Sequence, residues 1–213
     1  MKAGQRAAER FAGDRFLHGY ARGKTAWDPA YAAVASRLRG RDRPLLDIGC
    51  GVGLLAAYLR EEGCLQPILG IEPDAMKVET ARVRVGGVYP GLEFRVGTAE
   101  DLPDFAGDVV MLDVLHYMPP DVQAGVLRGM AGRLSPGSRM LIRTAFRDGS
   151  WRYGVTMLEE GFVRLSGWIR GGRCHFPKRE ELCGPLEQKG CACTVSPMWG
   201  ATPFNSHFIE VVR

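Results

Sequence analysis

The stretch LLDIGCGVG, residues 45–53, decides how the rest of the chain is interpreted. A short, mostly apolar run that suits a buried strand leads into three glycines at alternate positions, and the helix-forming run LLAAYLREEG follows. A strand, a glycine-rich loop and a helix in this order turn backbone N–H groups of the helix N-terminus toward a ligand. The stretch therefore predicts a ligand-binding loop at the first strand of an α/β domain.

The spacing of the glycines helps to distinguish between ligands. The dinucleotide pattern GxGxxG, started at Gly49, needs a glycine at the position of Leu54, and the chain has GxGxG instead. Asp47, two residues before Gly49, would repel a pyrophosphate but suits a cationic group such as an amino-acid ammonium. Glu72, at the end of the next expected strand, suits two ribose hydroxyls in either kind of ligand. An NAD site is thus the disfavoured alternative.

Strands and helices alternate over most of the chain. The expected strands are 44–48, 67–72, 92–96, 108–114 and 138–145, and the helices between them are 53–63, 73–85 and 119–134. This alternation predicts a parallel sheet covered by helices on both faces. A helix over 177–190 then precedes two strands, 191–200 and 207–213, joined without a helix, which predicts one antiparallel strand.

The N-terminal region is expected to be helical to about residue 20, with Phe11, Phe16 and Leu17 buried. GYARGKT (19–25) is interpreted as a loop, and Asp28 is expected to cap a helix that begins at Pro29. The whole chain, 1–213, is expected to form one domain, with a helical lid (1–43), a cofactor-binding half (44–145), an insertion or substrate cap (146–176) and a C-terminal part (177–213).

Composition indicates an ordinary globular protein, with 46% hydrophobic and 24% charged residues and a net charge of +4. No apolar run approaches the roughly 18 residues of a membrane span, and the N-terminus lacks a signal-peptide pattern. A cytoplasmic location without a membrane span is therefore predicted. Cys191 and Cys193 form a CxC in an expected strand; we interpret them as small core residues rather than as a metal site, and predict no metal.

DIGCGVG resembles the first motif of the class I S-adenosylmethionine-dependent methyltransferases. Over about 44–213 this resemblance implies an α/β, Rossmann-like, seven-stranded, mostly parallel sheet with helices on both faces and an antiparallel final strand. GTAEDLP (97–103) is similar to the family's adenine-binding segment, often GDAEDLP, with Thr98 in place of the acid; LDVLHYMPP (112–120) resembles the segment beside the methyl-transfer face. The resemblance implies S-adenosylmethionine as cofactor, bound by Asp47, Gly49, Cys50, Gly51, Gly53, Glu72, Pro73, Thr98, Ala99, Glu100, Asp113 and Val114.

Four further residues are candidates for the reaction or for cofactor binding. His116 is a candidate general base for a hydroxyl acceptor, or else a wall residue of the pocket. Tyr117 would shape the same pocket or belong to the core. Tyr20 and Arg22, in GYARGK, are interpreted as part of a lid that reaches the methionyl carboxylate or an acidic substrate, with a solvated loop as the alternative.

The expected insertion gives clues to the acceptor. The stretch from Arg143 to Arg179, which contains it, has eight basic and three acidic residues, and aromatic residues at 151, 153, 162, 168 and 176. A basic, aromatic-rich cap suits an anionic or aromatic small molecule, free or on an acidic carrier protein. Such a cap would also suit RNA or protein. However, enzymes that methylate amino groups of DNA or of glutamine side chains carry [Asn/Asp]-Pro-Pro-[Tyr/Phe] after their fourth strand, and this chain has DVLHY there. Nucleic acid is therefore disfavoured.

WDPAY (27–31) and TPFNSHF (202–208) resemble segments of bacterial methyltransferases of aryl-polyene-type pathways, which implies a phenolic or aryl acid methylated on oxygen or carbon. The leading prediction is methyl transfer to a small molecule. The alternatives are an RNA or protein methyltransferase that uses the basic insertion, and a non-catalytic protein that binds S-adenosylmethionine. The sequence indicates no particular oligomeric state.

Overall fold

A computed structural model describes residues 1–100, 104–165, 174–200 and 202–213. The chain divides into two compact units, Met1–Val110 and Met111–Arg213. Among the described residues the strands form a seven-stranded sheet in the order β3-β2-β1-β4-β5-β7-β6. β7 is antiparallel to its neighbours β5 and β6, whereas β1, β2 and β3 are parallel. The predicted mostly parallel α/β fold with a reversed final strand is confirmed.

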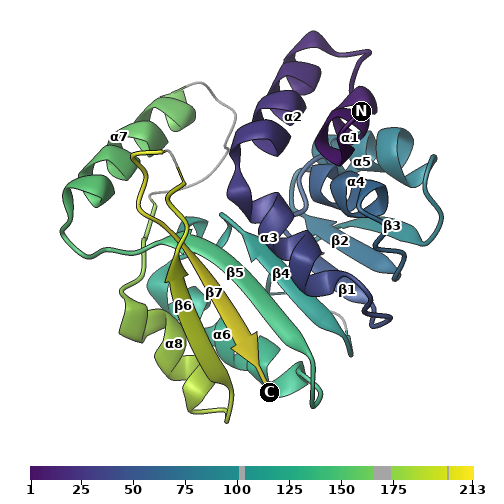
Figure 1. The fold of residues 1–213 in the computed structure, drawn as a ribbon. Helices are drawn as coiled ribbons and strands as arrows, with labels where there is room; N and C mark the ends of the chain where they lie inside the picture. The colour runs from purple at the N-terminus through teal and green to yellow at the C-terminus, as the bar shows by residue number, and fades with distance from the viewer. Residues whose placement is uncertain (101–103, 166–173, 201) are drawn as a thin grey trace. The chain divides into compact units, whose positions relative to one another are not determined.

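The first unit places the glycine loop directly after β1, whose four residues are all buried; Figure 1 shows this strand. The parallel strands β1, β2 and β3 lie side by side, and α5 packs against β2 and β3. Its elements are α1 (Ala3–Glu9), α2 (Arg15–Trp27), α3 (Pro29–Leu38), β1 (Leu45–Ile48), α4 (Leu54–Glu61), β2 (Ile68–Glu72), α5 (Ala75–Ala81), the π-helix η1 (Arg82–Gly86) and β3 (Leu92–Val96).

Local sequence accounts for the helix starts in this unit. The carboxylates of Asp14, Asp28 and Asp74 each accept hydrogen bonds from backbone N–H groups of the turn that follows, as N-cap residues do. Pro29 occupies the first turn of α3, where its missing N–H costs nothing. The predicted cap and start of the helix at Asp28-Pro29 are thereby confirmed.

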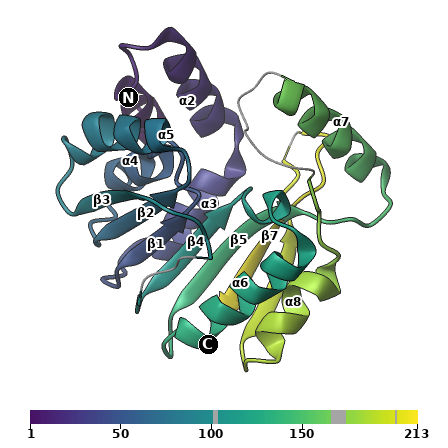
Figure 2. The same ribbon diagram turned by 180° about the vertical axis from the view of Figure 1, so that it is seen from behind.

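The second unit carries the antiparallel part of the sheet. β4 (Asp108–Leu112) ends in it, and α6 and α8 lie side by side, with α8 next to β6 (Figure 2). Its other elements are the 3-10 helix η2 (Leu115–Tyr117), α6 (Pro120–Arg133), β5 (Arg139–Ala145), α7 (Trp151–Leu165), α8 (Arg179–Glu187), β6 (Ala192–Pro197) and β7 (Ser206–Val212). Within the described part of the chain, no helix is long and apolar enough to cross a membrane.

The structure corrects the predictions for the N-terminal region. The expected first helix is two helices, α1 and α2, and the expected loop over residues 19–25 lies inside α2. The loop was predicted from Gly19 and Gly23, which both lie within α2. A different glycine, Gly4, lets α1 approach α2, because a Cβ there would lie 2.8 Å from Cβ of Thr25. Phe11 and Leu17 are buried as predicted, whereas Phe16, the second residue of α2, is 63% exposed.

Two other boundaries differ. The helix expected over 73–85 is divided between α5 and the π-helix η1, and the expected insertion 146–176 contains the helix α7. Cys191 comes just before β6 rather than inside it, so strand alternation does not pair it with Cys193. Cys191 is buried, as expected of a small core residue.

Candidate functional site

The glycine loop in the first unit owes its shape to three left-handed residues. Gly49, Gly51 and Gly53 have φ of 76°, 53° and 80°, a region that side chains other than glycine adopt only with strain. A Cβ on Gly53 would lie 3.0 Å from Cζ of Phe94, whereas a Cβ on Gly51 would meet nothing within 4 Å. The loop thus packs tightly at Gly53 and leaves its backbone accessible at Gly51.

Asp47 brings an uncompensated acid to the start of this loop. Its side chain lies in β1 and is 3% exposed, and within the described residues Oδ2 has no hydrogen-bond partner. Burial, and secondarily the charge of Glu72, raises the pKa of Asp47 to about 7. A buried carboxylate without a cation is unfavourable, so this position suits a ligand that carries a positive charge.

Glu72 holds the loop in place from the end of β2. Its Oε2 accepts a hydrogen bond of 3.1 Å from the Gly51 N–H, and its Oε1 accepts one of 3.2 Å from the Asp74 N–H. The side chain is 8% exposed. Glu72 therefore positions the loop backbone as well as offering its oxygens to a ligand.

Cys50 fills the space beneath the loop. Its thiol is buried, and burial raises its pKa well above the usual value. A Cβ on Gly70, in β2, would lie 2.7 Å from the Cys50 Sγ, so the glycine at this position makes room for the thiol. Pro73, the residue after β2, is exposed.

The other candidate cofactor residues of this unit lie on two segments. Thr98 is exposed and its hydroxyl accepts from the Glu100 N–H at 3.3 Å, Ala99 is buried, and Glu100 is exposed. The rest of that motif, 101–103, lies outside the described residues. Tyr20, half-buried, and Arg22, exposed, are helical residues of α2. Their binding roles stay predictions.

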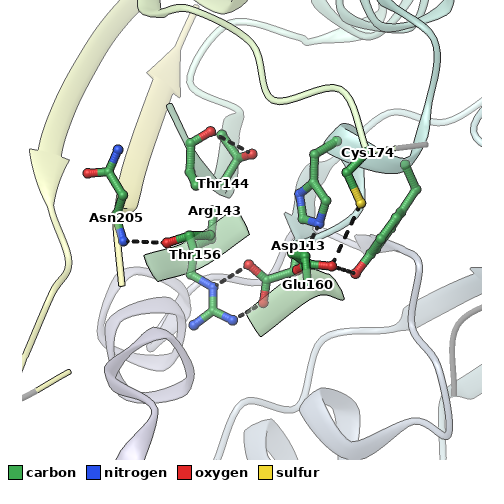
Figure 3. A network of polar contacts seen from close by, with 10 residues as sticks. Asp113, Arg143, Thr144, Thr156, Glu160, Cys174 and Asn205 are labelled. Carbon is green, nitrogen blue, oxygen red and sulfur yellow. Dashed lines mark hydrogen bonds and ion pairs between the residues drawn. The ribbon is translucent and has the colours of Figure 1, made fainter. Parts of the chain in front are cut away.

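In the second unit an acid at the end of β4 is paired with an arginine (Figure 3). Asp113 has φ of 59°, the one left-handed residue other than glycine in the described part of the chain. Nε of Arg143 donates to Oδ1 of Asp113 at 2.8 Å, the same guanidinium contacts Oδ2, and the Asp113 N–H donates to the Arg143 carbonyl at 3.0 Å. Val114, half-buried, follows and precedes η2.

The carboxylate of Glu160, labelled in Figure 3, lies close to both His116 and Tyr117. His116 is 2% exposed and stacks on Phe176 at 4.6 Å between ring centroids, and its Nε2 lies 3.6 Å from Glu160 Oε1. The Tyr117 hydroxyl donates to Glu160 Oε2 at 3.2 Å, and the Cys174 thiol contacts the same oxygen at 3.8 Å. Burial lowers the pKa of His116 to about 4 and raises the pKa of Tyr117. His116 is therefore neutral at pH 7 and able to accept a proton.

The first unit has a cavity of about 490 Å³ that is separate from the glycine loop and Glu72. Pro44, Pro67 and Gly91, which precede β1, β2 and β3, help to line it. Parallel α/β sheets bind ligands at the opposite, carboxyl ends of their strands, where the glycine loop and Glu72 lie.

A family model described as a methyltransferase domain matches residues 20–195. The chain belongs to this methyltransferase family. The family is S-adenosylmethionine-dependent, which confirms the predicted cofactor class and the class I assignment. The residues that would contact the cofactor in this chain remain proposals.

Curated relatives are also methyltransferases. Methyltransferase GfsG of Streptomyces halstedii is 33% identical over 127 residues, which are 57% of this chain and 45% of GfsG. A ubiquinone biosynthesis O-methyltransferase of Xylella fastidiosa is 26% identical over 199 residues, 77% of this chain and 78% of the relative. The chain spans about half the length of some curated relatives that it matches, including GfsG.

A solved structure shares the fold. Magnesium protoporphyrin IX methyltransferase of Synechocystis PCC 6803, crystallised with S-adenosylhomocysteine, superposes with a TM-score of 0.67 at 19% identity, covering 96% of this chain and 93% of that one. The likeness supports the Rossmann-like methyltransferase architecture described above.

Glu160 and Arg143, the residues that contact His116 and Asp113, were not identified as site residues from the sequence. Glu160 is on α7, 44 residues after His116, and no motif links the two. Arg143 was counted in the basic cap, yet it is 7% exposed in β5 and paired with Asp113. The available signal was a charged residue inside an otherwise apolar strand, which requires a partner of opposite charge.

The described cationic side chains of the expected cap mostly have partners. Arg147 pairs with Glu181 at 3.0 Å. The Arg152 guanidinium stacks on Trp151 and Trp199 at 4.7 Å and 4.5 Å from the ring centroids. The side chain of Arg164, and residues 166–173 with Arg170 and Arg173, lie outside what the structure describes. The described part thus offers less free positive charge than its composition implied.

Proposed function

We propose that this protein transfers a methyl group from S-adenosylmethionine to a small-molecule acceptor, with a hydroxyl oxygen as the favoured target. The observation that carries the proposal is Asp47: a buried carboxylate with an oxygen that lacks a partner in the described structure, beside an accessible glycine loop, in a chain of the methyltransferase family. S-adenosylmethionine supplies both a cation that this carboxylate can pair with and an activated methyl group.

In this mechanism the first unit provides the binding energy. The Asp47 carboxylate would accept hydrogen bonds from the ammonium group, and the half-buried backbone at Gly49 and Gly51 would support the methionyl portion. Glu72 holds the Gly51 N–H, and its carboxylate would also accept hydrogen bonds from ribose hydroxyls. Alignment of two bound reactants and exclusion of water can supply most of the rate of a methyl transfer. The adenine is assigned to Thr98 and the Ala99 backbone.

In the second unit His116 is proposed to accept the proton of the acceptor hydroxyl. A histidine whose pKa is lowered to about 4 is a weak base by itself. Glu160 offsets this weakness, because its carboxylate, 3.6 Å from Nε2, stabilises the imidazolium that proton transfer creates. Tyr117 keeps that carboxylate in place through its hydroxyl. The alternative role of His116, a wall residue, predicts a change in KM rather than in kcat.

The acceptor is proposed to be aromatic or anionic, free or attached to a carrier protein, and to be modified in the cytoplasm. The rings of His116 and Phe176, which are stacked, and that of Tyr117, which is tilted against His116, favour an aromatic compound. A ubiquinone biosynthesis O-methyltransferase among the relatives agrees with a phenolic hydroxyl. The aryl-polyene-type assignment remains a narrower prediction within this class. Arg143 and Arg147 each form an ion pair with an acidic residue of the protein. Less positive charge is therefore available to a substrate, which weakens the alternative of RNA or protein.

The test uses S-adenosylmethionine labelled in its methyl group. The purified protein is first titrated with it by calorimetry, then incubated with a bacterial extract that is fractionated into small molecules, RNA and protein. We expect label in the small-molecule fraction, lost in Asp47→Asn and retained in Asp42→Asn, an exposed aspartate of the same unit. Label in RNA or protein would overturn the proposed acceptor class, and absence of binding would overturn the role of Asp47.

A further inference from the structure

Two cysteines and a glutamate meet on the second unit, in a place that the proposed methyl transfer does not use. Cys183 and Glu187 are one turn apart on α8, and Cys193 is the second residue of β6, the strand against which α8 packs (Figure 2). One ligand atom of each, the two sulfurs and a carboxylate oxygen, lie within 4.8 Å of one another. Cys183 is buried, Cys193 half-buried and Glu187 exposed.

This arrangement matches the donor set of a zinc site. With Zn–S bonds of about 2.3 Å and a Zn–O bond of about 2.1 Å, tetrahedral coordination separates its donor atoms by about 3.6–3.8 Å. Donors already within 4.8 Å reach that separation by small side-chain rotations. Two thiolates select soft or borderline ions over magnesium and calcium. The exposed position of Glu187 leaves the fourth coordination position to water.

The local charges also favour metal binding. Arg179 lies one turn before Cys183 on α8, and its positive charge acts on the Cys183 sulfur. Thiolates are the metal-binding form of cysteine. Two thiolates and one carboxylate around a divalent ion leave one negative charge, which Arg179 offsets.

We propose that Cys183, Cys193 and Glu187 bind a zinc ion that joins α8 to β6. The ion would stabilise the edge of the sheet, because β6 pairs with one neighbour only, β7, in the described strand order. The proposal does not depend on the methyl-transfer reaction. It also differs from the CxC pair considered in the sequence, since Cys191 is not part of the cluster.

The test measures metal binding directly. The reduced, metal-free protein is titrated with Co²⁺, and the thiolate-to-cobalt charge-transfer absorption is followed; Zn²⁺ is then added in competition with a chelator. We expect one ion per chain. Affinity should fall more than about 100-fold in Cys183→Ser and Cys193→Ser, and about tenfold in Glu187→Gln. Cys191→Ser is the matched control and should keep wild-type affinity.

Three results would overturn the proposal: no charge-transfer absorption, absorption that survives the Cys183→Ser, Cys193→Ser double variant, or equal loss in the Cys191→Ser control. Circular dichroism of each variant separates loss of a ligand from loss of the fold. Counting free thiols before reduction shows whether Cys183 and Cys193 form a disulfide in the purified protein. If they do, and the reduced protein binds no Zn²⁺, the metal site is excluded.

Discussion

Replacing Asp47 with asparagine should stabilise the ligand-free protein while weakening its binding of S-adenosylmethionine. The pKa of Asp47 is raised from 3.8 to about 7, mainly by burial. The folded state therefore holds a proton between about pH 4 and pH 7 that the unfolded chain has released. Folding stability from this group is present below pH 4 and is lost as the pH rises to 7.

The magnitude follows from the size of this shift. About three pKa units correspond to roughly 4 kcal/mol, an upper value for the cost of the ionised carboxylate at pH 8. Asparagine keeps the shape and never ionises, so Asp47→Asn should raise the free energy of unfolding at pH 8 by up to about 4 kcal/mol. In urea, where small proteins lose about 1–3 kcal/mol per molar, the midpoint should rise by more than about 1 M.

The assay is urea denaturation of wild type and variant at pH 8 and at pH 4, with binding measured by calorimetry at pH 8. The gain should vanish at pH 4, where both side chains are neutral. The Kd for S-adenosylmethionine should rise by about 30-fold or more, since losing one partner of a buried charge pair costs about 2–5 kcal/mol. In the wild type the Kd for S-adenosylmethionine should also rise as the pH falls below 7.

The matched control is Asp108→Asn. Asp108 is fully buried in the same unit, but its carboxylate accepts two hydrogen bonds from Arg41, at 2.5 Å and 2.8 Å. Removing one partner of such a pair costs about 3–5 kcal/mol, so this variant should be less stable at pH 8. The uncompensated charge would be refuted if the Asp47→Asn variant were less stable than wild type at pH 8. It would also be refuted if the variant gained as much stability at pH 4 as at pH 8.

Three further predictions concern the proposed base, one glycine of the loop and the pair of Arg143 with Asp113. His116→Gln should lower kcat by about 100-fold or more and leave the Kd for S-adenosylmethionine unchanged, because the base contributes to the chemical step; a change confined to KM would show a wall residue. Gly53→Ala should lower the free energy of unfolding by about 1–3 kcal/mol in urea, because φ is 80° and Phe94 is in the way; an unchanged midpoint would contradict this. Arg143→Gln should cost about 2 kcal/mol and reduce activity, since Asp113 loses its guanidinium partner; thermal unfolding with intact stability would exclude the structural role of the pair.

The sequence predicted the fold where local physics decides it. Strand 92–96 and the helix that begins at Pro29 follow from apolar runs and a cap, and both are confirmed. The glycine loop was recognisable because glycine is the residue type that adopts positive φ without strain. These features depend on neighbours in the chain, so a single sequence contains the information for them.

The errors come from contacts between distant residues. Gly4, which permits the close approach of α1 and α2, indicated nothing by itself until Thr25 was seen beside it. Arg143 was interpreted as surface charge because its partner is 30 residues away. Cys183 was overlooked because its contact with Cys193 depends on how α8 packs against β6. Pairings of this kind follow from tertiary packing, which spacing alone does not predict.

Three aspartates in or directly after the central strands β1 and β4 show how the structure identifies a ligand position. Asp108 has Arg41 and Asp113 has Arg143, so their negative charges are compensated within the protein. Asp47 is buried, as Asp108 is, yet its Oδ2 lacks a partner in the described structure. Because a buried charge without a partner is costly, its presence beside the glycine loop is best explained by a cationic group supplied from outside the chain. The compensated acids maintain the fold, and the uncompensated one is the position at which we expect S-adenosylmethionine to be recognised.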